Sequence, residues 1–157
     1  MACSFVSTRD YAGCAVLALR GDLDSSDRAE LSSRLAAVAS CGPWVIADLT
    51  NLAYTDCGSL GVLAAVRERA QRAGGDVLPA GPRGAVAWML LLTGRAGEFS
   101  VFPSVGVAAF GARLAAIGTR LAAIGTRLAT DGAGKSLAAA TAAGVPDLKP
   151  STTRSAA

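Results

Sequence analysis

Apolar residues in the central part of the chain change their spacing from that of a strand to that of a helix. The run from Trp44 to Ile46 is short and has two β-branched members, which is typical of a strand covered on both faces. Turn residues follow at 48–51. Beyond position 56 the apolar spacing becomes helical and lasts up to Gly74-Gly75, a pair that favours a helix end. The apolar positions of this predicted helix are Leu60, Leu63 and Val66. The segment 56–59 therefore lies where a helix begins.

The segments before and after this centre alternate between strand and helix patterns. Such alternation predicts an α/β layer with a partly parallel sheet, to which the first strand is added through a hairpin with its turn at 9–13. In order, the predicted elements are strands 4–7 and 14–19, a helix capped by Asp24 or Ser25 and ended at 41–43, strand 44–46, a helix from 56–59 to Gly74, strand 76–80, helix 83–92, strand 99–102 and a helix opened by Ser104.

Composition narrows the kinds of partner that fit the chain. Its 157 residues suit one domain, and the formal charge of +3 is spread over arginines that alternate with acids, so we expect no nucleic-acid partner. Hydrophobic residues make up 52%, but no run of about eighteen apolar residues is uninterrupted, and we expect no membrane span. The first ten residues do not resemble a secretory signal. We therefore expect a cytoplasmic protein whose partners are proteins or small molecules.

Cysteines and the lack of histidine limit the chemistry. The four cysteines, Cys3, Cys14, Cys41 and Cys57, form no Cys-x-x-Cys pair, and we expect most of them to be buried, reduced thiols. Cys57 is a redox candidate, because a thiol at a helix N-terminus tends to have a lowered pKa; simple packing is the alternative. Without histidine, Ser-His-Asp and Cys-His catalysis are excluded. We predict no catalytic residues, no metal, no cofactor and no enzymatic activity.

Several segments together resemble one known family. They are Gly21-Asp-Leu-Asp24, Val45 to Leu52 followed by Tyr54-Thr-Asp-Cys-Gly-Ser-Leu-Gly61, Arg72-Ala-Gly-Gly75, and Leu92-Thr-Gly94 with Phe99-Ser-Val-Phe102. In order and spacing they resemble the STAS-domain anti-sigma factor antagonists, over residues 4–113. The resemblance implies an α/β fold: a STAS-type mixed β-sheet with an N-terminal hairpin strand, packed α-helices and an extended C-terminal helix.

The same resemblance implies a partner-switching protein. Members of the family bind an anti-sigma factor that is also a serine kinase and so free a sigma factor for transcription. Phosphorylation of the antagonist cancels binding, because a phosphoserine adds about −1.5 to −2 charges within the binding surface. The partner-binding residues that the resemblance implies here are Asp24, Asp56, Cys57, Gly58 and Leu60.

This chain departs from the family at the phosphoacceptor. The family has serine two residues after the aspartate, followed by glycine, whereas this sequence has Gly58 and then Ser59. A shift of one residue turns a helical side chain by about 100°. Three hypotheses stay open: Ser59 is a displaced acceptor; the protein binds its partner and is never phosphorylated; or it has lost anti-sigma binding or is controlled through Cys57. A ligand or redox sensor is the alternative function.

A duplication follows the family-like region. Residues 113–119 recur unchanged at 120–126, and each copy costs about 1 kcal/mol of helix propensity at its glycine. We predict a STAS domain over 1–113, an extension of the last helix over 114–129 and a flexible Ala/Gly/Ser/Thr-rich tail over 130–157. A weak homodimer is the alternative use of the extension, because its apolar residues follow a heptad pattern. They are Leu114, Ile117, Leu121, Ile124 and Leu128.

Overall fold

The computed structural model describes residues 4–130, with side chains from 10 to 123. It contains the strands β1 (Ser4–Tyr11), β2 (Cys14–Leu23), β3 (Trp44–Thr55) and β4 (Asp76–Ala80), and the helices α1 (Arg28–Cys41), α2 (Cys57–Arg72), α3 (Gly84–Leu92) and α4 (Val105–Thr130). The chain divides into two compact units at position 119, within α4. Apart from residue 130, the predicted tail lies outside the described residues.

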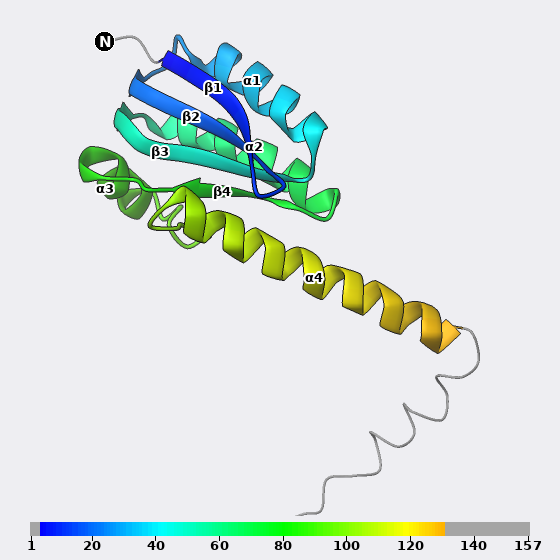
Figure 1. The fold of residues 1–157 in the computed structure, drawn as a ribbon. Coiled ribbons are helices and arrows are strands. Elements are labelled where there is room, and N and C mark those ends of the chain that lie inside the picture. The colour runs from blue at the N-terminus through cyan, green and yellow to red at the C-terminus, as the bar shows by residue number, and fades with distance from the viewer. Residues whose placement is uncertain (1–3, 131–157) are drawn as a thin grey trace, which may run out of the picture. The chain divides into compact units, whose positions relative to one another are not determined.

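The four strands form one mixed sheet in the order β1-β2-β3-β4 (Figure 1). β1 is antiparallel to β2, and β2, β3 and β4 run parallel to one another. The hairpin turn has positive φ at both Ala12 and Gly13, a geometry that matches the right-handed twist of the flanking strands. The predicted α/β sheet with its N-terminal hairpin strand is therefore confirmed.

Helices cover both faces of this sheet, because alternate strand residues point to opposite sides. On one face, Leu17, Val45 and Val77 pack with buried residues of α1, α2 and α3. On the other face, Val16, Ile46 and Leu78 pack with three alanines of α4. The alanines are Ala108, Ala109 and Ala112.

The predicted turn at 48–51 is wrong, because β3 continues through it to Thr55. Leu49 and Leu52 are buried, so this half of the strand also contributes to the core. Asp48 does make the local bonds of a turn residue, since its Oδ1 accepts from the N–H and the hydroxyl of Thr50 at 3.1 and 2.7 Å. These bonds coincide with an irregularity in the β2–β3 register, which lets the strand bend without ending.

The predicted strand at 99–102 is reduced to a single parallel bridge between Ala80 and Phe102. Two backbone bonds make this bridge: Phe102 N–H to Pro79 at 2.9 Å and Gly81 N–H to Phe102 at 2.8 Å. Phe99 is itself buried. The guanidinium of Arg67, from α2, lies over its ring, 5.6 Å from the ring centre. Phe99 is therefore buried beside α2 without strand pairing.

The predicted cap of α1 is also displaced. The helix begins at Arg28 after Asp27, and neither Asp24 nor Ser25 is its cap residue. The backbone N–H of Asp27 donates to the Asp24 carbonyl at 3.2 Å, so 24–27 form a turn ahead of the helix. The predicted core positions of α1, namely Leu31, Leu35 and Val38, are all buried.

α4 is a single helix of 26 residues that includes the segment 114–129. Within the described residues one stretch of it, Val105–Ala123, has the length and the mean hydropathy, 1.3, of a helix that could cross a membrane. Only 17% of that stretch is buried, and helices that pack on a soluble core meet the same two criteria. Length and composition alone therefore do not assign this helix to a membrane.

Candidate functional site

Asp24 and Asp56 lie side by side because they follow two neighbouring parallel strands. Leu23, the last residue of β2, pairs with Thr55, the last residue of β3. The N–H of Asp56 donates to the Leu23 carbonyl at 3.3 Å, which joins the two strand ends directly. The carboxyl ends of parallel strands are where α/β folds commonly gather functional residues. The candidate site is therefore this edge of the sheet with the first turn of α2.

Asp56 caps α2 and pairs with a cation at the same time. Its Oδ1 accepts from the backbone N–H of Ser59 at 2.7 Å, as a cap residue does three positions ahead of the donor. Its Oδ2 accepts from the guanidinium of Arg28 at 2.7 Å. Burial raises the pKa of the Asp56 carboxyl, but the hydrogen bonds from Ser59 and Arg28 outweigh burial and hold this pKa below its usual range. Asp56 is therefore an ionised structural acid.

Asp24 orders the loop between β2 and α1. Its Oδ1 accepts from both the hydroxyl and the backbone N–H of Ser26, at 2.6 and 2.8 Å. These hydrogen bonds lower the pKa of the Asp24 carboxyl, and the bond from the Ser26 hydroxyl has the larger effect. The side chain is exposed, so Asp24 presents a fixed negative charge at the protein surface.

Ser59 lies inside the protein. Its exposed fraction is 0%, and its hydroxyl donates to the Asp24 carbonyl at 3.3 Å. The residue thus ties the first turn of α2 to the loop after β2. The hydroxyl is therefore not exposed to solvent.

Gly58, at the family's acceptor position, lies under the side chain of Arg28. A Cβ atom at position 58 would overlap the Arg28 guanidinium, and the Nε of that guanidinium is buried without a hydrogen-bond partner. Arg28 reaches across the glycine to Asp56 and so covers the first turn of α2. Arg28 was not predicted as a site residue, because nothing in a lone arginine 28 positions before Asp56 signals this pairing.

Cys57 is exposed at the first position of α2, and its thiol lies 3.8 Å from the sulfur of Met89 in α3. The expectation that most cysteines are buried is wrong for the three in the described residues, because Cys41 is also exposed and only Cys14 is buried. Burial raises the pKa of the Cys14 thiol and keeps it protonated. Cys3 lies outside the described residues.

The predicted site residues thus divide into an outer and an inner group. Asp24 and Cys57 are exposed, and Asp56 and Gly58 are partly so. Ser59 and Leu60 are buried, so they support this surface from beneath. In the residues that the structure describes, no group of three or more metal-ligating side chains occurs.

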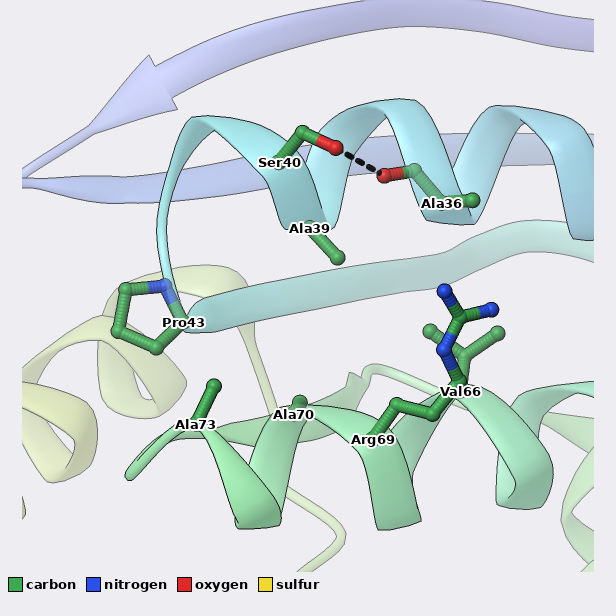
Figure 2. Close-up of a pocket in the computed structure, with 8 residues that line it drawn as sticks. All are labelled: Ala36, Ala39, Ser40, Pro43, Val66, Arg69, Ala70 and Ala73. Atoms are coloured by element: carbon green, nitrogen blue, oxygen red, sulfur yellow. Dashed lines mark hydrogen bonds between the residues drawn. The ribbon is translucent and has the colours of Figure 1, made fainter.

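A pocket opens at the other end of the same two helices (Figure 2). It measures about 180 Å³ and is lined mainly by small side chains of α1 and α2, with Arg69 at its side. The Ser40 hydroxyl there donates to the Ala36 carbonyl at 2.9 Å and is thus already used. A larger apolar hollow of about 350 Å³ lies beside α3, lined by Leu90, Leu91 and Phe102 among others. Neither includes a predicted site residue.

Comparisons with known proteins agree on the domain type. A family model described as "Mlab, STAS domain" matches residues 6–101, which is more than half of the chain. A sequence search of curated proteins finds no match.

Solved structures of two kinds share the fold. An anti-sigma factor antagonist from Mycobacterium paratuberculosis has a TM-score of 0.64 at 24% identity, covering 71% of this chain and 95% of its own. A proposed anti-sigma factor antagonist from Thermotoga maritima has a TM-score of 0.63 at 16% identity, covering 68% and 93%. A sulfate transporter family protein from Wolinella succinogenes has a TM-score of 0.57 at 17% identity, covering 66% and 88%. At these identities the likeness establishes the fold and leaves the function open.

Proposed function

We propose that this chain, which belongs to the STAS-domain family, is an anti-sigma factor antagonist. It binds an anti-sigma factor of the serine-kinase type and so frees a sigma factor. It acts by binding rather than by catalysis, in the cytoplasm, with no nucleic-acid partner, cofactor or metal. One observation carries the proposal: Asp24, Asp56 and the first turn of α2 lie together and form one surface.

Two properties of this surface support a protein partner. Asp24 presents a carboxylate whose position is fixed by bonds to Ser26, and fixed charges give an interface orientation and specificity. The loop after β2 and the start of α2 are tied through Ser59, so they would meet a partner as one preformed unit. The two segments would therefore lose little conformational entropy on binding.

We further propose that phosphorylation of Ser59 does not control this binding. The burial of its hydroxyl and the bond to the Asp24 carbonyl support this choice among the three hypotheses. At the family's acceptor position, Gly58 has no hydroxyl, and Arg28 covers it. The chain would then bind its partner whether or not the kinase is active.

The binding part of the proposal is tested by charge reversal. The purified chain is titrated with each anti-sigma factor of the kinase type that its own genome encodes, using calorimetry. We expect one of them to bind, and we expect Asp24→Lys to weaken that binding by about tenfold or more. Glu68→Lys is the matched control, because it makes the same charge change on an exposed part of α2 away from the site. Failure of every anti-sigma factor to bind would overturn the proposal.

The phosphorylation part is tested separately, with the same kinase and ATP, by mass spectrometry. We expect no phosphate on Ser59 of the folded chain. Gly58→Ser restores a hydroxyl at the family's position, and we expect that variant to be phosphorylated once Arg28 is displaced; Arg28→Ala combined with Gly58→Ser should react faster. Phosphate on Ser59 of the unaltered chain would contradict this part and leave the binding proposal standing.

Cys57 supports a second candidate, redox control of the same binding. Its thiol is exposed within the surface and lies beside the Met89 sulfur, so oxidation of the thiol would alter the binding face. If this is correct, treatment with peroxide lowers partner affinity in a Cys41→Ser background and leaves it unchanged when Cys57→Ser is added. Equal losses in both variants would exclude Cys57.

A further inference from the structure

α4 packs on the sheet with its small residues and exposes its large ones. Ala108, Ala109 and Ala112 are buried in the second core cluster. At about 100° per residue, the large apolar residues lie on nearly the opposite side of the helix. These are Val107, Phe110, Leu114, Ile117 and Leu121, with exposed fractions of 46–64%. We call them the α4 seam. Because a helix of a soluble monomer normally turns such residues inward, the seam lacks a partner in the described part of the chain.

The seam follows a heptad pattern longer than the duplicated segment. From Val107 the spacing alternates between three and four residues, and the sequence continues it at Ile124 and Leu128. The seven positions span three complete heptads of one helix, a length that favours a coiled coil. The duplication alone is too short for this conclusion. Val107 and Phe110, which the structure leaves exposed, supply the missing heptad.

Charges along the seam distinguish between the orientations of a second copy. With Leu114 as position a, Arg113, Arg120 and Arg127 occupy the g positions, and Gly118 and Gly125 occupy e positions. In a parallel pair each g residue faces an e residue of the next heptad in the other helix, so arginines meet glycines. In an antiparallel pair, arginines would face arginines. The parallel pair avoids this repulsion, and the glycines leave room for the arginine side chains.

The same features disfavour a membrane as the occupant. An interfacial helix has a broad apolar face and a strongly basic polar face. In α4 the apolar stripe is narrow, the arginines lie along one edge of it, and the opposite face is alanine-rich and packs on the sheet at Ala108, Ala109 and Ala112. A second copy with the same heptad stripe would cover the seam along its length.

We propose that the α4 seam is a self-association surface on which a second copy of this chain packs in parallel. The proposal does not depend on the anti-sigma function. Leucine at a with isoleucine at d, as in the duplicated heptads, shifts parallel coiled coils towards trimers or tetramers, so a discrete oligomer of any of these sizes fits the seam.

The test is the solution mass of the full chain, measured by sedimentation from low to high micromolar concentration. We expect a discrete multiple of the 15.7 kDa of one chain. Ile117→Asp with Leu121→Asp should return the protein to a monomer. Both residues are exposed, so the domain should stay folded by circular dichroism. Ala115→Asp is the matched control on an exposed position outside the seam and should keep the oligomer.

Orientation is tested by mixing the chain with a variant carrying Arg113→Glu and Arg120→Glu. Parallel packing predicts no preference for mixed oligomers, whereas antiparallel packing predicts that mixed oligomers dominate and would overturn the parallel arrangement. A chain that stays monomeric at every concentration would overturn the proposal. If that monomer sediments with vesicles rich in anionic lipid, the seam belongs to a membrane surface instead.

Discussion

Asp56 uses its two carboxylate oxygens for two different tasks, and the tasks can be separated by mutation. One oxygen caps α2 through the Ser59 N–H, and the other pairs with Arg28. Capping residues contribute about 0.5–2 kcal/mol, whereas partly exposed ion pairs contribute about 0.2–1 kcal/mol. The cap should therefore account for most of the stability that Asp56 provides.

We expect Asp56→Ala to lower the free energy of unfolding by about 1–2 kcal/mol, because both interactions are lost. Asp56→Asn should cost less than about 1 kcal/mol, since asparagine caps a helix as well as aspartate does. Urea unfolding at neutral pH measures both. Equal losses in the two variants would mean that the ion pair, and not the cap, is the larger contribution.

The same residue predicts a pH dependence. Because the pKa of Asp56 is lowered in the folded protein, its contribution is fully present above the unfolded value of about 3.9 and is lost as pH falls through the lower folded value. Asp56→Asn does not titrate, so it should lose less stability than the unaltered chain on going from neutral pH to about pH 3.

Ser59 gives a second prediction at this scale. We expect Ser59→Ala to cost about 0.5–1.5 kcal/mol, the worth of one hydrogen bond. Ser59→Glu should cost about 3 kcal/mol or more, because it places an uncompensated charge in a fully buried position. Thermal unfolding measures the loss, with Ser32→Glu on the exposed face of α1 as the control. A stable Ser59→Glu variant would show that this hydroxyl can reach solvent.

The acidic residues of the site were predictable from the sequence, but their surroundings were not. The position of Asp56 ahead of an apolar helical pattern was enough to place it at the start of a helix, because that pattern is local. The burial of Ser59 depends on a bond to the Asp24 carbonyl 35 positions earlier, and the cover over Gly58 depends on Arg28. Contacts between distant segments leave no local pattern that a single sequence can display.

The connection from α2 to β4 shows how one turn fixes the spacing of two elements. Gly75 is buried, and a Cβ atom there would overlap the carbonyl oxygen of Pro43. That oxygen also accepts from the N–H of Asp76 at 3.1 Å, so it cannot easily move. The start of β3 and the start of β4 are thereby held at contact distance.

We therefore expect Gly75→Ala to lower the free energy of unfolding by about 1–3 kcal/mol, the usual cost of forcing an extra carbon into a packed site. Gly42→Ala is the matched control. Its φ of 172° is open to any residue, and a Cβ atom there would meet nothing within 4 Å. Chemical denaturation compares the two. A neutral Gly75→Ala would mean that the turn is free to widen.

At the scale of elements, the sequence predicted helices best where apolar residues kept a helical spacing without interruption. The apolar positions of α1 and α2 were predicted correctly because each helix has one buried stripe. The predictions at 48–51 and 99–102 were wrong for opposite reasons. Asp48 makes turn-like bonds inside a continuing strand, and Phe99 is buried without strand pairing. In both places tertiary contacts override the local preference.

At the scale of the whole molecule, the buried core does not extend to the end of the part of α4 whose side chains are described. Among the described residues, the last buried side chain is that of Ala112. We expect a chain that ends after Thr119 to unfold with a free energy within about 0.5 kcal/mol of the full chain at concentrations where both are monomeric. The truncated chain should no longer self-associate, because it has lost the later heptads of the seam. A large loss of stability would show that residues beyond 119 support the domain.

The fold class was predictable because the alternation of elements and the family-like motifs both extend over the whole domain. The exposure of the α4 seam was not predictable, because the sequence pattern alone allows these residues to pack on the domain or on another helix. The choice depends on the three alanines that α4 turns towards the sheet. Alanine is so frequent in this chain that their spacing carries no signal on its own.

The late position of α4 in the chain has a consequence for synthesis on the ribosome. The face of the sheet formed by Cys14, Val16, Ile46 and Leu78 packs against three alanines of α4, with Phe102 partly buried beside them. All four strands leave the ribosome before Ala108 to Ala112 do, so this apolar face stays uncovered by α4 until that helix has also emerged. The nascent chain thus passes through an aggregation-prone stage that ends when α4 emerges and packs on the sheet.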